Sequence, residues 1–125
     1  MSGAVLAYLG DAVIEIMTRQ RVIESGVTNV GKLNKMAAKY VRATVQSEGV
    51  ERMLPHLSEE ETDVFKRGRN AHGVAIPKSA TALEYRRATG MEALFAYLYL
   101  NGRSERLSEL FDIAFPKEET EISDN

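Results

Sequence analysis

The sequence contains no cysteine and no tryptophan, and it has only two histidines, His56 and His72. Without cysteine the chain cannot form disulfide bonds, thiolate zinc sites or a thiol nucleophile, and two histidines are too few for a histidine-rich metal cage. No apolar run reaches the roughly 20 residues that a membrane span requires, and the N-terminus lacks a signal-peptide pattern. We therefore expect a cytoplasmic protein, or one of the chloroplast stroma in a plant, with no membrane partner. Any bound metal would rely mainly on carboxylates.

The chain does have enough apolar residues for one compact domain. It is 125 residues long and 44% hydrophobic, which allows a single domain to bury roughly two thirds of its unfolded surface. The net charge of −2 argues against a protein that binds nucleic acid through overall positive charge. The charge is unevenly distributed, however, so a local basic surface remains compatible with this total.

Apolar residues at helical spacing, together with capping signals, predict five or six helices. Ser58 with Glu61, and Thr81 with Glu84, each form a capping box that marks the start of a helix. The expected helices span residues 3–25, 29–54 with an interruption at Gly49, 58–67 with an end at Gly68, 81–100 and 104–115. Because no strand pattern is present, we expect an all-α fold. We expect a domain at residues 1–116 and an acidic, disordered tail at 117–125.

Two acidic positions within apolar helices are the first candidates for chemistry. Asp11 and Glu15 lie one turn apart in a helix that is apolar on more than one side, and Glu92 is the only charged residue between Ala88 and Leu100. A simple interpretation is that these acids are partly exposed and paired with Arg19 or another base. Alternatively, Asp11 and Glu92 converge on a divalent cation that compensates both charges, because Mg²⁺ needs only one or two protein carboxylates in addition to water and phosphate oxygens.

A basic segment is the second candidate for function. Residues 66–87 contain six basic residues and one acidic residue, a local balance of +5 that leaves −7 for the rest of the chain. Within it, residues 69–79 form a long predicted loop with glycine and proline. The segment is either a solvated surface or a site for phosphate groups. The candidate contacts are Lys66, Arg67, Arg69, Asn70, His72, Lys78 and Arg86.

Four separated motifs together resemble the ribonuclease III catalytic domain. The first is "LAYLGDAV", which is similar to the first signature helix of that family, and the second is "KRGRN" together with the "PK" that follows it. The third is "YR", and the fourth is "MEALFAYLYL" after it, which is similar to the second signature helix. The order of all four motifs resembles the compact Mini-III branch over roughly residues 3–115. This resemblance implies an all-α ribonuclease III catalytic (endonuclease) domain that acts as a helical homodimer.

The resemblance also implies an activity and a set of site residues. Mini-III enzymes cleave double-stranded RNA with Mg²⁺, for which Mn²⁺ is a substitute, and they mature the ends of the large-subunit (23S) ribosomal RNA precursor, with a ribosomal protein as a further expected partner. Asp11 and Glu92 match the signature acids expected at the metal. Glu48 falls where ribonuclease III has a further acid, and Glu15 is a candidate substitute. The chain departs from the wider family at Ala7 and Thr89, where ribonuclease III has carboxylates.

Two other functions remain open at this point. A non-catalytic double-stranded RNA-binding or ribosome-assembly module on the same fold would bind duplexes without Mg²⁺ and release no cut products. A helical dimerisation protein would leave the basic segment without a role. Cleavage of a structured ribosomal RNA precursor with Mg²⁺ or with a chelator would separate all three functions.

Overall fold

The protein is all-helical over the residues that the structure describes, which are 1–71, 78 and 80–117 of a computed structural model. The predicted fold class is therefore confirmed for these residues. The elements are α1 (Gly3–Ile23), α2 (Val30–Tyr40), α3 (Ala43–Met53), the 3₁₀ helix η1 (Leu54–His56), α4 (Glu59–Arg69), α5 (Ala82–Leu100) and α6 (Ser104–Ala114). Most of the expected loop, including His72, and the expected tail after Lys117 lie outside the described residues.

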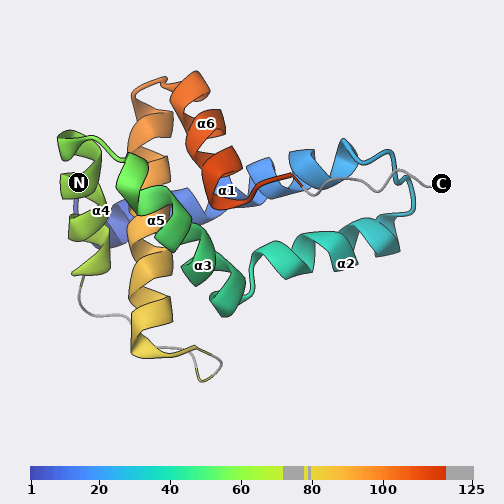
Figure 1. Ribbon diagram of the computed structural model, residues 1–125, viewed down its shortest axis with the longest axis horizontal. Coiled ribbons are helices and arrows are strands. Elements are labelled where there is room, and N and C mark those ends of the chain that lie inside the picture. The colour runs from blue at the N-terminus through green and yellow to red at the C-terminus, as the bar shows by residue number, and fades with distance from the viewer. Residues whose placement is uncertain (72–77, 79, 118–125) are drawn as a thin grey trace.

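Helix α5 is the centre of the molecule. Figure 1 shows α1 crossing it, with α3, α4 and α6 arranged around it. Six residues in the second half of α5 are completely buried: Met91, Ala93, Leu94, Phe95, Ala96 and Leu98. Because a helix that is apolar on nearly all sides has to be covered on nearly all sides, this sequence determines which helix lies in the core. Glu92 is therefore carried into the middle of the fold.

The expected helix over residues 29–54 is two helices, and the break is not at Gly49. Helix α2 ends at Tyr40, with Val41 as its C-cap. Arg42 then takes an extended conformation with φ −65° and ψ 138° before α3 begins. Gly49 lies inside α3, where a Cβ would be 3.0 Å from the Ala114 carbonyl oxygen. The break allows α2 to pack along α1 while α3 packs against α5 and α6. Tertiary packing therefore overrides the continuous apolar spacing.

The helix expected over residues 58–67 is predicted to end at Gly68. This end is wrong, because the corresponding helix, α4, continues to Arg69. The two capping boxes, by contrast, are present as expected. Ser58 accepts a hydrogen bond from the backbone of Glu61, Thr81 accepts one from the backbone of Glu84, and each glutamate side chain accepts one in return. These reciprocal bonds satisfy backbone N–H groups that a helix start leaves free.

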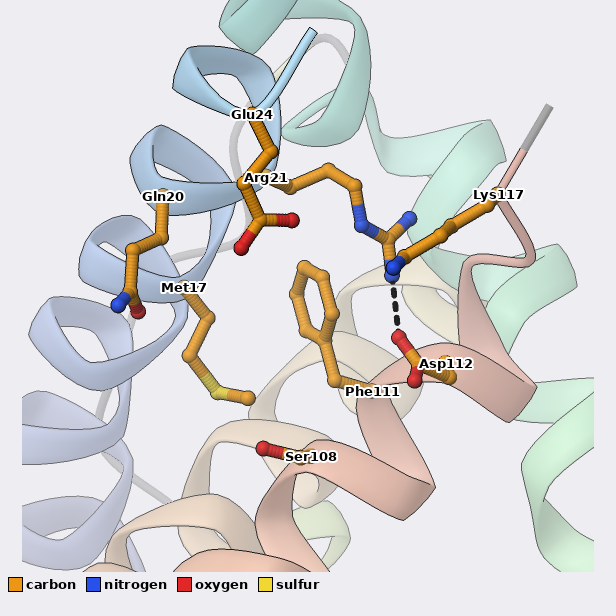
Figure 2. A pocket seen from close by; sticks show the side chains of 8 residues that line it. All are labelled: Met17, Gln20, Arg21, Glu24, Ser108, Phe111, Asp112 and Lys117. Carbon is orange, nitrogen blue, oxygen red and sulfur yellow. Dashed lines mark hydrogen bonds and ion pairs between the residues drawn. The ribbon is translucent and has the colours of Figure 1, made fainter. Parts of the chain in front are cut away.

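Two arginines hold the C-terminal end of α6. Arg52 on α3 donates to the Ala114 carbonyl oxygen at 2.6 Å, and Arg21 on α1 donates to the Phe115 carbonyl oxygen at 2.6 Å. Figure 2 shows Arg21 also paired with Asp112 at 2.5 Å, above a hollow between α1 and α6. Cations are favourable at this end of a helix dipole. The hollow is lined by neither Asp11 nor Glu92, so we regard it as part of the scaffold.

One face of α1 is apolar and exposed. Ile16 is 64% exposed, and Tyr8 is 85% exposed. Val5 and Ile23 are exposed on the same face of the helix, at intervals of three, eight and seven residues. Helix α1 is therefore apolar on a second face that the described part of this chain does not cover. None of the described helices is long and apolar enough to span a membrane.

Candidate active site

The two signature acids are brought together where α1 crosses α5. Gly10 lies against the backbone of Glu92 so closely that a Cβ at position 10 would be 1.7 Å from the Glu92 carbonyl oxygen. A residue with any side chain would therefore push the two helices apart. Asp11 follows directly after Gly10, and its side chain interacts with that of Glu92. The missing side chain of Gly10 allows this close approach.

Asp11 affects the protonation of Glu92, because the two carboxyl groups share one site. The pKa of Glu92 is raised from 4.5 to about 8, first by burial, then by the negative charge of Asp11 and by a hydrogen bond between the two side chains. Glu92 is partly buried and Asp11 is exposed. Two neighbouring carboxyl groups cannot both ionise easily without a positive charge beside them. Without a cation, Glu92 therefore keeps its proton at neutral pH.

The positions at which the chain departs from the wider family add no ligand to this pair. Ala7 is buried and has no polar side-chain atom. Thr89 is also buried, and its hydroxyl donates to the Tyr85 carbonyl oxygen at 2.9 Å within its own helix. The Thr89 hydroxyl is therefore engaged by the backbone and does not replace a carboxylate.

The two supporting acids are placed differently from the pair. Glu15 is exposed and forms an ion pair with Arg19 at 2.7 Å, as the simple interpretation of its spacing proposed. Glu48 is exposed on α3, and among the described residues it is Asp11 alone whose carboxylate raises the pKa of Glu92. No group of three or more Asp, Glu or His side chains that could hold a metal occurs in the part of the chain that the structure describes.

A divalent cation fits the pair nevertheless. Mg²⁺ keeps several waters and is usually bound through one or two carboxylates together with substrate phosphates. Asp11 and Glu92 supply two carboxylates, and burial and the charge of Asp11 raise the pKa of Glu92 with no opposing contribution from a cation of the described residues. These two residues are therefore the ones that could hold a metal.

The basic candidates surround the junction between α4 and α5. Lys66, Arg67 and Arg69 occupy the last turn of α4, Asn70 is its C-cap, and Arg86 is exposed near the start of α5. In Figure 1 these two helix ends lie at the same end of the molecule. Lys78 is exposed between them, whereas His72 lies outside the described residues. The exposed cations are therefore gathered on one region, as the charge count suggested.

Not every cation in this segment is free to bind a ligand. Arg87, which contributes to the local charge of +5, donates to the Ser47 hydroxyl at 2.9 Å and lies 3.7 Å from Glu51, so it joins α5 to α3. Arg67 donates to the Met1 carbonyl oxygen, and Arg69 donates to the Asn70 side chain at 3.1 Å. These bonds use only part of the five N–H donors of each guanidinium group, so both residues can still contact a phosphate. Counting charges along the sequence could not distinguish these roles.

A second basic surface, on α2, was missed by the sequence reasoning. Lys32, Lys35 and Lys39 are exposed and spaced by three and four residues, which places them on one face of the helix. Their side chains form no ion pair within the described part of the chain. The available signal was the complete absence of acidic residues between positions 25 and 47.

Helix α2 is held to the body through an aromatic contact. Tyr40 stacks on Phe111 with 6.3 Å between ring centroids, and it meets the edge of Phe115 at 5.6 Å. No residue of α2 is fully buried.

Comparison with known proteins gives consistent matches over nearly the whole chain. The ribonuclease III domain family matches residues 4–103. A Mini-ribonuclease 3 of Symbiobacterium thermophilum is 50% identical over 87% of this chain and 84% of that protein. A Mini-ribonuclease 3 of Desulfitobacterium hafniense is 45% identical over 90% of this chain and 71% of that protein. A crystal structure of a protein from Fusobacterium nucleatum is similar with a TM-score of 0.82 and 33% identity, over 90% of this chain and 86% of that one.

Proposed function

Because this chain belongs to the Mini-ribonuclease 3 group of the ribonuclease III family and is an endoribonuclease, we propose that it cleaves double-stranded RNA in a Mg²⁺-dependent reaction. Ribonuclease III enzymes act on double-stranded RNA and generally depend on a divalent metal. We further propose the large-subunit ribosomal RNA precursor as the substrate. The observation that carries the proposal of Mg²⁺-dependent cleavage is the contact between the side chains of Asp11 and Glu92.

The acid pair would hold the metal, and its protonation would change in the process. A bound divalent cation would neutralise charge on the phosphate oxygens and activate water as the nucleophile. Asp11 would act as an ionised ligand, and Glu92 would lose its proton to become the second ligand. Because Glu92 is partly buried, its carboxylate would attract the cation in an environment that screens charge less than bulk water does. Glu48 and Glu15 remain the candidate supporting acids of this proposal.

The basic surfaces would hold the duplex by its backbone. Double-stranded RNA is recognised mainly by shape and by contacts to phosphate and 2′-hydroxyl groups. The exposed cations at the α4–α5 junction and the lysines of α2 supply charge of the required sign at two separate places. We therefore propose that affinity is modest and falls steeply with salt concentration.

We also propose that the active form is a homodimer joined through α1. The exposed apolar face of α1, which contains Val5, Tyr8, Ile16 and Ile23, supports this proposal because such a face is unfavourable in water. Pairing through α1 would bring an acid pair of each copy to one shared substrate, so that each copy could cut one strand. The large exposure of Tyr8, at 85%, makes it the leading candidate for burial in the partner.

Replacement of Asp11 by Asn tests the proposal. We expect Asp11→Asn to lower the cleavage rate at least about 100-fold, because it removes one of two charged groups at the reacting phosphate. Duplex binding should be retained, since the basic surfaces are unchanged. The substrate is an end-labelled RNA duplex incubated with Mg²⁺ or with chelator, and a precursor of large-subunit ribosomal RNA is mapped for its ends in parallel.

The matched control is Asp63→Asn, which makes the same chemical change at an exposed position on α4. This control should cut like the wild type. Mg²⁺-dependent cleavage by Asp11→Asn at the wild-type rate would refute the catalytic assignment. Cleavage of the duplex without cleavage of the ribosomal RNA precursor would refute only the proposed substrate.

A further inference from the structure

Helices α4 and α5 meet at two facing glycines. A Cβ at Gly68 would lie 2.5 Å from the Ala93 Cβ and 2.7 Å from the Thr89 carbonyl oxygen. A Cβ at Gly90 would lie 2.7 Å from the Phe65 ring and 2.9 Å from the Phe65 carbonyl oxygen. Each glycine therefore accommodates the opposite helix. The two backbones approach more closely than residues with side chains would permit.

This contact brings the basic end of α4 to the turn of α5 that carries Glu92. Gly68 lies between Arg67 and Arg69 in the last turn of α4. The groups that face it belong to Thr89, Gly90 and Ala93, which are the residues on either side of Glu92 along α5. The candidate phosphate contacts are therefore held at the level of the acid pair.

The same turn of α5 is held from another side by α1. There, the backbone of Glu92 itself is the group that a Cβ at Gly10 would strike, at 1.7 Å. The turn that carries Glu92 is thus in backbone contact with α1 and in close contact with α4. Its position relative to both neighbouring helices depends on the absence of two side chains.

We propose that Gly68 is a positioning residue, which fixes the separation between the phosphate-binding cations at the end of α4 and the Asp11–Glu92 pair. This inference rests on the proposed function. A strand whose phosphates are bound by Lys66, Arg67 and Arg69 would then present its scissile phosphodiester at the acid pair. Gly68 itself touches no substrate; it acts through the distance between two helices.

The size of the expected effect follows from the contact distances. Apolar carbon atoms in contact lie about 4 Å apart, whereas a Cβ at position 68 would be 2.5 Å from the Ala93 Cβ. The helices would have to separate by about 1.5 Å to admit a methyl group without other adjustment, and a displacement of about 1 Å in a catalytic arrangement already lowers the rate about 100-fold. Binding depends on charges that remain exposed, so the affinity should change by less than about threefold.

The experiment compares Gly68→Ala with the wild type on one RNA duplex. Multiple-turnover cleavage with Mg²⁺ at saturating duplex gives kcat. Fluorescence anisotropy in the presence of chelator gives Kd, and circular dichroism confirms that each variant is folded at the assay temperature. We expect kcat to fall about 100-fold and Kd to stay within about threefold. Leu110→Ala, which creates a cavity in the buried face of α6, is the control for a loss of stability alone; it should retain the wild-type kcat.

A compensating variant keeps the test valid if Gly68→Ala does not fold. Gly68→Ala/Ala93→Gly removes the methyl group that lies nearest, but leaves the Thr89 carbonyl oxygen at 2.7 Å. Compared directly with the wild type, the folded double variant should have a kcat that is about tenfold lower and a Kd within about threefold. A wild-type kcat in this variant would overturn the positioning role.

The results distinguish failure of this inference from failure of the proposed function. An unchanged kcat in folded Gly68→Ala, or equal losses of kcat and affinity, would overturn the positioning role while the function stands. A wild-type protein that does not cut the duplex would overturn both.

Discussion

The raised pKa of Glu92 predicts that the metal-free protein is destabilised at alkaline pH by one of its own site residues. In the folded chain this pKa is about 8 because of burial and the neighbouring Asp11, whereas the ordinary value is 4.5. The folded state therefore binds more protons than the unfolded state between these values. The free energy of unfolding must decrease as the pH rises through this window. The difference between the two pKa values corresponds to about 3 to 5 kcal/mol above pH 8.

Replacing Glu92 with Gln should remove this pH-dependent loss. Glutamine resembles the protonated acid, so Glu92→Gln should match the wild type near pH 5 and be more stable by about 3 to 5 kcal/mol near pH 9. Urea unfolding followed by circular dichroism at pH 5, 7 and 9, with chelator and at one protein concentration, measures the difference. Glu48→Gln is the control, because Glu48 is exposed on α3. An equal stability change at pH 5 and pH 9 would refute the reasoning, as would no gain at pH 9.

Two further predictions follow from the acid pair and from the interior of α1. Binding of Mg²⁺ at pH 7 should release nearly one proton per acid pair, because the pKa of Glu92 lies at about 8 and the ligand must be ionised. Calorimetry in two buffers of different ionisation enthalpy measures the number of protons released. If no proton is released, Glu92 is excluded as a ligand. Thr18→Val should raise the free energy of unfolding by about 1 kcal/mol, because the buried Thr18 hydroxyl has no hydrogen-bond partner among the described residues. A decrease in the thermal unfolding midpoint of this variant would show that the hydroxyl does form a hydrogen bond in the folded protein.

The sequence predicted the helices that carry strong local signals. The capping boxes at Ser58 and Thr81 start α4 and α5 as expected, because their hydrogen bonds join residues only three positions apart. The break after Tyr40 has no comparable signal, since neither glycine nor proline occurs there. Only the separate packing of α2 on α1 and of α3 on α5 explains it, and such contacts between distant residues are not visible in local spacing.

Gly68 illustrates why the remaining errors arose. A glycine after a run of charged residues is typical of a helix end, yet here it lies within α4 and allows contact with α5. Both uses depend on the missing side chain, so the sequence alone could not separate them. The position of Gly90 twenty-two residues later gives no indication that the two glycines face each other.

The candidate site was predicted in outline and not in detail. Motifs led to the expectation that Asp11 and Glu92 lie together, and the helix crossing does bring them together. The pairing of Glu15 with Arg19 also follows from their spacing of four residues. The direction of Arg87 toward α3 and the exposure of Ile16 could not be deduced, because both depend on which neighbouring helix, or which partner, covers that side.

The glycine contacts also bear on how this domain can tolerate sequence change. Where helices meet through bulky side chains, each core substitution shifts the backbones a little, and such shifts accumulate over many replacements. At Gly10 the spacing is instead set by main-chain atoms of Glu92, which do not vary from one residue type to another, and at Gly68 it is set by main-chain atoms of Thr89 and Gly90 together with the Ala93 methyl group. Residues of the hydrophobic core around Phe95 could therefore be substituted during evolution while the distance between the Asp11 and Glu92 carboxyl groups is maintained.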